Sequence, residues 1–188
     1  MRVIAGEFRS RRLKSLPGDA TRPTPDRLRE TLFDILAPRI EGVTFLDAYA
    51  GTGAVGIEAL SRGASHCIFL EKDRAAVETI RQNLASLGLE RRATVVKGAV
   101  LLTLPKSPAG IVFLDPPYSL DREYSAVLEL LALAPPALAV VQHPVRMALP
   151  DSFGELRRTR LLRQGDNALS FFSQSENLPP GQIGAMTV

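Results

Sequence analysis

The most distinctive chemistry-bearing motif is the tetrapeptide Asp115-Pro116-Pro117-Tyr118, which follows the apolar segment Ile111–Leu114. The prolines restrict the backbone, so the Asp115 carboxylate and a main-chain carbonyl can converge on one point, beside the aromatic face of Tyr118. An aromatic exocyclic amine is a poor nucleophile because its lone pair is conjugated into the ring. Two acceptors on its N–H groups would stabilise the positive charge that develops during attack. The motif therefore favours chemistry at such an amine over a rigid turn without function.

A second motif is a glycine-rich loop, which runs from Asp47 to Gly56 after a short apolar segment. Gly51, Gly53 and Gly56 have the G-x-G-x-x-G spacing, which lets backbone N–H groups approach a ligand closely. Glu71 ends the next apolar segment, 20 residues after Gly51, where an acid can bind ribose hydroxyls. Together these features predict a nucleoside-cofactor site rather than a tight turn beside a surface acid.

The identity of that cofactor is a separate question, because the glycine spacing is compatible with NAD. Asp47 stands four residues before Gly51, at the tip of a predicted strand. An acid there suits the cationic amino-acid end of S-adenosylmethionine better than a pyrophosphate. The residues thus favour the methyl donor and leave NAD open, although an oxidoreductase would leave Asp115–Tyr118 unexplained.

Short apolar segments alternate with amphipathic ones along the chain, as in Cys67–Leu70 followed by Arg74–Leu87. Continuous apolar segments are typical of strands buried on both faces, and hence of a parallel sheet covered by helices. We predict a doubly wound α/β domain with a mostly parallel, seven-stranded Rossmann-like sheet, in which both motifs follow strands. Glu155–Arg163 and Ala168–Ser173, around a Gly165 turn, predict a terminal antiparallel hairpin.

Two elements are expected near the N-terminus. Arg2–Ile4 reads as a short strand. The stretch from Pro25 to Ala37 predicts a helix, with Thr24 as its N-cap and Pro25 at its first position.

Composition bounds the function classes. The chain has 188 residues, 45% of them apolar, which suits one globular domain. No apolar stretch is long enough to span a membrane, and the first residues lack the apolar region of a signal peptide. Cys67 is the single cysteine and there are two histidines, so we expect no disulfide, no metal site and a cytoplasmic setting.

The charge of +3 is unevenly distributed. The first 29 residues carry a net charge of +5 and the remainder a net charge of −2. A basic segment beside a near-neutral body is compatible with binding a polyanion and also with a solubilising tail. We predict a basic arm over residues 1–24, a catalytic domain over 25–173 and a loose tail over 174–188.

Several segments resemble the bacterial 16S rRNA guanine-N2 methyltransferases of the RsmD type, which use S-adenosylmethionine. The resemblance rests on the N-terminal Met1–Gly6, the stretches Thr21–Phe33 and Leu46–Ala64, the motif Asp115–Tyr118 and the closing Gly165–Phe172. Together these segments span residues 1 to about 173.

The resemblance implies roles for individual residues. The methyl donor, with S-adenosylhomocysteine as product, would be bound by Asp47, Tyr49, Gly51, Thr52, Gly53, Glu71, Lys72 and Ala99. The target amine would meet Asp115 and the Pro116 carbonyl, with Pro117 fixing the turn and Tyr118 stacking on the base. RNA phosphates would be bound by Arg2, Arg9, Arg11, Arg12, Arg22, Thr24 and Arg29. The implied enzyme is a metal-free monomer whose partner is small-subunit rRNA or a 30S assembly intermediate, with the target base flipped out.

Two positions depart from relatives. Ala99 stands where an Asp or Asn commonly reaches adenine, so a backbone contact or another side chain must serve. Gln142 stands where relatives often have Glu, which changes the hydrogen bonding if that position helps to seat the base. The alternatives are an adenine-N6 or other amino-group methyltransferase on DNA or protein, an NAD-binding oxidoreductase, and a non-catalytic RNA-binding assembly factor.

Overall fold

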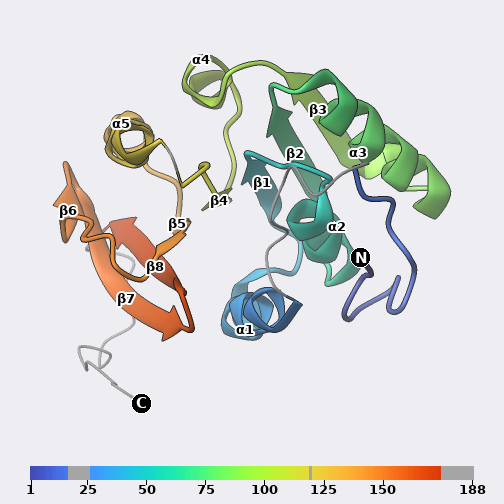
Figure 1. Cartoon of the computed structure of the whole chain (residues 1–188), viewed down its shortest axis with the longest axis horizontal. Helices are drawn as coiled ribbons and strands as arrows, with labels where there is room; N and C mark the ends of the chain where they lie inside the picture. The colour runs from blue at the N-terminus through green and yellow to red at the C-terminus, as the bar shows by residue number, and fades with distance from the viewer. Residues whose placement is uncertain (17–25, 119, 175–188) are drawn as a thin grey trace.

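A central β-sheet dominates the computed structural model, which describes residues 1–16, 26–118 and 120–174 (Figure 1). Its strands are β1 (Thr44–Ala48), β2 (His66–Glu71), β3 (Ala93–Lys97), β4 (Ile111–Leu114), β5 (Leu138–Pro144), β6 (Ser152–Phe153), β7 (Leu156–Gln164) and β8 (Asn167–Gln174). Their order across the sheet is β3-β2-β1-β4-β5-β8-β7-β6. The first five are mutually parallel and the last three antiparallel.

The predicted α/β class, the mostly parallel sheet and the terminal hairpin are confirmed, but the strand number is corrected. The described residues form eight strands rather than seven. The additional strand is β6, which has only two residues and pairs with the start of β7. Two residues are too few to leave a periodic signal in a sequence.

Helices cover both faces of the sheet. They are α1 (Asp26–Leu36), α2 (Ala54–Ser61), α3 (Arg74–Leu87), α4 (Val100–Thr103) and α5 (Asp121–Ala132), with short 3-10 turns at Ala37–Arg39, Glu90–Arg92 and Leu104–Lys106. Helices α1, α2 and α3 pack on the face that holds Phe45, whereas α4 and α5 pack on the face that holds Leu46. Neighbouring strand residues enter opposite cores because side chains alternate along a strand.

The bounds of α3 match the sequence prediction, and its caps explain why. The Asp73 side chain accepts a hydrogen bond from the Ala76 N–H at 2.8 Å, and Gly88 ends the helix with φ of 69°. The predicted N-cap Thr24 and the first helical position at Pro25 lie outside the described residues.

The sheet order brings four strand ends together. Because β1, β2, β4 and β5 are parallel, their carboxyl ends share one edge of the sheet. From β1 the chain builds outward through β2 and β3, and then returns to place β4 and β5 on the other side of β1. Such a reversal leaves a crevice at the carboxyl edge, where α/β proteins bind ligands.

Residues 1–16 fold back against this domain. Arg2 and Arg12 form an isolated antiparallel bridge, which replaces the expected short strand at Arg2–Ile4. Val3 and Leu13 are buried in the core that also holds α2 and α3. We call residues 1–16 the arm hairpin; it shares the hydrophobic core between the sheet and these helices.

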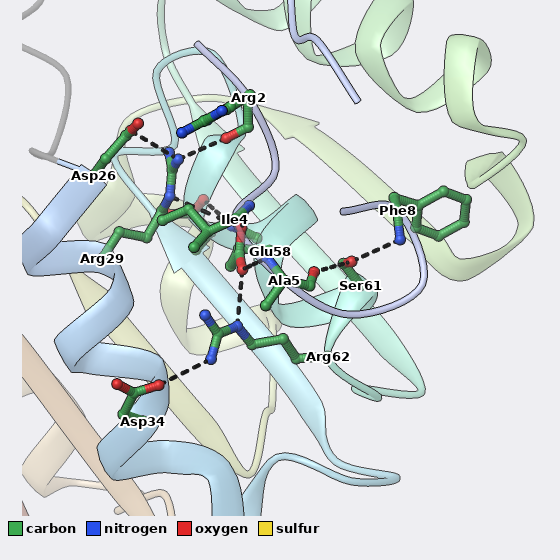
Figure 2. A network of polar contacts seen from close by, with 12 residues as sticks. Arg2, Ile4, Ala5, Phe8, Asp26, Arg29, Asp34, Glu58, Ser61 and Arg62 are labelled. Carbon is green, nitrogen blue, oxygen red and sulfur yellow. Dashed lines mark hydrogen bonds and ion pairs between the residues drawn. The ribbon is translucent and has the colours of Figure 1, made fainter. Parts of the chain in front are cut away.

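A buried carboxylate ties the arm hairpin to α2, as Figure 2 shows. Glu58 is fully buried, and its Oε2 and Oε1 accept hydrogen bonds from the main-chain N–H groups of Ile4 (2.8 Å) and Ala5 (3.0 Å). The Arg62 Nε–H donates to the same carboxylate at 2.8 Å, and the Arg29 guanidinium lies 4.0 Å away. The carboxylate therefore combines two backbone donors with two cations.

We expect Glu58→Ala to lower the free energy of unfolding by about 3–5 kcal/mol, because it leaves buried donors and a buried cation uncompensated. Urea denaturation measures the loss. The matched control is Asp34→Ala, which removes an exposed carboxylate 3.3 Å from Arg62 and should cost less than about 1 kcal/mol. Equal losses in the two variants would contradict a special role for the buried group.

Candidate active site

One cavity of 570 Å³ occupies the carboxyl edge of the sheet. Its walls come from the segments that follow β1, β2, β3 and β4, from β5 and β8, and from the arm hairpin. Among the predicted site residues, the cavity is lined by Asp47, Tyr49, Gly51, Thr52, Glu71, Lys72, Ala99, Asp115, Pro116, Pro117 and Tyr118. The two sequence motifs therefore meet in a single space.

The glycine loop is held in place by Glu71 at the end of β2. The Gly51 N–H donates to Glu71 Oε2 at 2.8 Å, and the Asp73 N–H donates to Glu71 Oε1 at 2.9 Å. Gly51 and Gly53 have positive φ angles of 55° and 81°, a conformation that L side chains rarely adopt. Each Glu71 oxygen keeps a further lone pair for a ligand hydroxyl.

Gly53 is not among the residues that line the cavity. It precedes α2, and a Cβ built on it would lie 3.2 Å from Ile80 and 3.3 Å from Phe69. The structure gives Gly53 a packing and turn role, and its contact with the cofactor stays a prediction. The sequence spacing could not separate these two reasons for a glycine.

Asp47 lies beneath the loop and is almost completely buried, although it lines the cavity. The Gly56 N–H donates to its Oδ2 at 2.8 Å. Burial raises the pKa of Asp47 well above its ordinary value, and the Asp115 and Glu71 carboxylates raise it further, against the lowering effect of the Gly56 N–H. Three carboxylates around one cavity favour a ligand that carries positive charge.

The Asp115–Tyr118 turn follows β4 directly, as predicted. The hydroxyl of Tyr124, in α5, donates to the Pro116 carbonyl at 2.8 Å. A carbonyl has two lone pairs, so Pro116 keeps one acceptor site for a ligand. Burial raises the pKa of Tyr124, which keeps its hydroxyl protonated and a donor.

The first turns of α5 connect the two motifs. Tyr49, whose φ is 65°, extends from the glycine loop and donates its hydroxyl hydrogen bond to Glu123 at 2.9 Å. The next residue, Tyr124, makes the bond to Pro116. Adjacent residues of one helix thus position the loop after β1 and the turn after β4.

Two cavity residues were missed or left undecided by the sequence, and both come from the C-terminal half of the sheet. Asn167, at the start of β8, accepts a hydrogen bond from the Tyr118 hydroxyl. In the sequence it belongs to the segment Gly165–Phe172 beside the predicted turn, and nothing there assigned it a role. Gln142, in β5, is 3% exposed, and its Oε1 has no hydrogen-bond partner in the described part of the chain. An unpaired buried acceptor costs about 1–3 kcal/mol.

Comparison with known proteins identifies the family. The family model described as conserved hypothetical protein 95 matches residues 1–173. Ribosomal RNA small subunit methyltransferase D of Escherichia coli K12 is 39% identical over 154 residues, which cover 80% of this chain and 78% of that protein. The chain belongs to the methyltransferase D family.

A solved structure of similar sequence agrees with this assignment, and a more distant one shares the fold. An Escherichia coli protein named as a candidate methyltransferase is 36% identical, with a TM-score of 0.79 over 93% of this chain and 97% of that one. An RNA methyltransferase of Salinibacter ruber, solved with S-adenosyl-L-homocysteine, is 17% identical and shares the fold, with a TM-score of 0.64 over 87% of this chain and 100% of that one.

The residues expected to contact nucleic acid in this methyltransferase fall into three groups. Arg2, Arg9, Arg11 and Arg12 are exposed on the arm hairpin. Arg29 is fully buried and donates to the Arg2 carbonyl at 2.7 Å, so its expected contact with RNA is corrected to a structural role. Arg22 and Thr24 lie outside the described residues.

The arm hairpin reaches across the face of the domain. Met1, Ser15 and Leu16 lie at the open end of the hairpin, where the two chain segments diverge, and they line the cavity. At its tip, the Glu7 N–H donates to the carbonyl of Ser61, the last residue of α2, at 2.8 Å. Since α2 has eight residues and is about 12 Å long, the tip lies roughly that far from the cavity.

No helix among the described residues is both long and apolar enough to cross a membrane. No group of three or more His, Cys, Asp or Glu side chains among them is arranged to hold a metal ion. Cys67 is buried, as its apolar context predicted.

We expect Asp47→Asn to stabilise the ligand-free protein as pH rises. The folded state holds the Asp47 proton more tightly than the unfolded chain, so the wild-type protein loses stability once the unfolded carboxyl ionises above about pH 4. Asn cannot ionise, so its advantage in Tm should grow with pH and level off above the folded-state pKa. Calorimetry from about pH 4.5 to 8 measures it. Parallel curves of Tm against pH would contradict the expectation.

Proposed function

We propose that this protein transfers a methyl group from S-adenosylmethionine to the exocyclic N2 of a guanine in 16S rRNA. The observation that carries the proposal is the single cavity in which the glycine loop and Glu71 face the turn Asp115–Tyr118. Membership of the methyltransferase D family supports the same reaction. S-adenosylhomocysteine is the expected product.

The residues present fit the methyl donor. S-adenosylmethionine supplies an electrophilic methyl group on a positively charged sulfur. Asp47 and Glu71 give the cavity negative charge, and Glu71 has acceptor capacity left for ribose hydroxyls. Lys72 and Ala99 also line the cavity and are proposed to lie beside the adenine, where a backbone contact or another side chain would replace the acid or amide expected of relatives. A cationic ligand would also relieve the repulsion among the three carboxylates.

Asp115 and the Pro116 carbonyl are the acceptors proposed for the guanine amino group. They would orient the amine and stabilise its developing positive charge. Tyr124 fixes the Pro116 carbonyl by donating to it, and Asn167 fixes the hydroxyl end of Tyr118, whose ring would stack on the flipped base. The amine can lose its proton after methylation, so no strong general base is required.

The exposed arginines of the arm hairpin are proposed to bind RNA phosphates. Arg2 and Arg12 lie at the bridge near the open end, and Arg9 and Arg11 lie nearer the tip. An RNA bound along the hairpin would extend from the cavity over α2. Naked small-subunit rRNA and a 30S assembly intermediate remain the two proposed substrates, acted on by a metal-free monomer in the cytoplasm.

The experiment that tests the proposal supplies labelled S-adenosylmethionine with naked 16S rRNA and with partly assembled 30S particles from cells that lack the protein. Nucleoside analysis then locates the label. N2-methylguanosine at one position supports the proposal. N6-methyladenosine would retain the chemistry and overturn the base assignment, and label in protein would overturn the substrate class. A protein that binds no S-adenosylmethionine would overturn the proposal entirely.

Asp115→Ala should lower kcat by at least about 100-fold, because it removes one acceptor for the reacting amine. Its affinity for S-adenosylmethionine, measured by calorimetry, should fall far less than kcat, because Asp47 and Glu71 still provide negative charge in the cavity. Asp115→Asn retains an acceptor oxygen, so its kcat should lie between those of Asp115→Ala and the wild type. The control Asp121→Ala removes an exposed carboxylate at the start of α5 and should retain activity. An Asp115→Ala enzyme with normal kcat would show that the amine is held elsewhere.

Replacing Arg9, Arg11 and Arg12 together by Glu should weaken RNA binding and lower the slope of log affinity against log salt by about 2. The reason is that a protein with fewer phosphate contacts releases fewer counterions from the RNA when it binds. Filter binding over a salt series measures the slope. The control replaces Arg39 and Lys106, exposed cations before β1 and β4, and should leave it unchanged. A triple variant with the wild-type slope would place the RNA on another surface.

A further inference from the structure

Gln142 occupies a position beside the reacting turn. It follows Val141 in β5, and Val141 pairs with Leu114, the residue that precedes Asp115. The Gln142 side chain lines the cavity together with Asp115 and Tyr118, and it is 3% exposed. Of the buried side-chain polar atoms that lack a partner in the described part of the chain, only Gln142 Oε1 belongs to a residue lining the cavity.

A second side-chain amide that lines the cavity, that of Asn167, has a hydrogen-bond partner for its oxygen. Gln142 pairs with Leu169 in β8, and Asn167 lies two residues from Leu169, so the two amides lie on one face of the sheet. Asn167 Oδ1 is occupied by the Tyr118 hydroxyl. Buried polar atoms of native proteins almost always have partners. Because Gln142 also lines the cavity, a ligand bound there could supply the missing donor.

The edge of guanine supplies that donor, and here the inference rests on the proposed function. With the N2 amino group at Asp115, the next group along the ring is N1–H, a donor, followed by O6, an acceptor. A Gln amide presents an acceptor oxygen and a donor NH2 side by side, which matches this pair. Adenine presents an acceptor at N1 beside its amino group, followed by C2–H, so it cannot form both bonds.

We propose that Gln142 is a specificity-determining residue that recognises guanine, accepting from N1–H through Oε1 and donating to O6 through Nε2. It would distinguish guanine from purines that carry an amino group without this pair of atoms. Asp115 and Pro116 hold the group that reacts, whereas Gln142 identifies the base that carries it. The Oε1 of Gln142 would remain unpaired until the base enters.

The test compares two RNAs with each of three proteins. One RNA carries guanosine at the methylated position, and the other carries 2-aminopurine, which retains the amino group and lacks N1–H and O6. The RNA is used naked or in the 30S particle, in whichever form accepts label. The proteins are wild type, Gln142→Met, and the control Gln164→Met, which replaces another glutamine with an unpaired buried oxygen on β7, outside the cavity lining.

We expect Gln142→Met to lower kcat/KM for the guanosine RNA by about 10- to 100-fold, the discrimination that one bidentate amide–base pair supplies. Its kcat/KM for the 2-aminopurine RNA should change less than about twofold, since that base never made the two bonds. Gln164→Met should leave both values unchanged. The Tm of Gln142→Met should equal or exceed that of wild type, because a buried unpaired polar atom is removed.

Other results distinguish a failure of guanine recognition by Gln142 from a failure of the proposed methyl transfer. A Gln142→Met protein that loses activity equally on both RNAs, with a lowered Tm, would show a structural role and overturn recognition by Gln142. Unchanged activity on the guanosine RNA would overturn it as well. In both cases wild-type formation of N2-methylguanosine would leave the proposed function standing. Failure of the wild-type enzyme to methylate the guanosine RNA would overturn the proposed function together with this inference.

Discussion

Three buried carboxylates hold irregular segments of this protein by accepting hydrogen bonds from main-chain N–H groups. Glu71 bonds to Gly51 in the glycine loop, Asp47 bonds to Gly56 in the first turn of α2, and Glu58 bonds to Ile4 and Ala5 in the arm hairpin. A carboxylate removed from water needs such partners, and a loop N–H removed from water needs an acceptor. Each bond therefore gives a partner both to a buried carboxylate and to a buried N–H group.

The same bonds determine the charge of the cavity. A guanidinium placed on Asp47 or Glu71 would have satisfied either group and cancelled its charge. Neutral N–H donors satisfy the oxygens and leave the negative charge in place. The cavity therefore keeps a field that favours a cationic ligand. Burial is the main reason why the pKa of Asp47 is raised, and the Asp115 and Glu71 carboxylates raise it further. Glu58, on the far side of α2, has cations beside it and belongs to the scaffold.

The sequence was sufficient to place both motifs at one sheet edge because local signals carried that information. Apolar strands, the glycine spacing and the proline-restricted turn are all read within about ten residues, and parallel pairing then brings the strand ends together. The α/β class and the terminal hairpin follow from the same patterns.

What the sequence could not supply depended on non-local contacts. Arg29 is a charged residue of a predicted helix, and its guanidinium is buried where it meets the Arg2 carbonyl of the arm hairpin and Glu58 of α2. Asn167 stands beside a predicted turn in the sequence, and it reaches Tyr118 through the antiparallel register of β8 against β5. Gly53 satisfied a ligand-binding spacing, yet its Cα faces Ile80 and Phe69. In each case the residue type indicated a possible role, but the sequence did not predict which residues lie beside it in the fold.

Helix α5 explains how two motifs that are far apart in the sequence can act on one reaction. Methyl transfer requires donor and acceptor atoms to be aligned, and small displacements are costly. Glu123 and Tyr124 are consecutive, so the loop proposed to face the methyl donor and the carbonyl proposed to face the amine are fixed to one helical turn. Tyr49 adopts a left-handed conformation to reach Glu123. Strain of this kind persists where the surrounding structure enforces it, and here it keeps the two halves of the cavity in register.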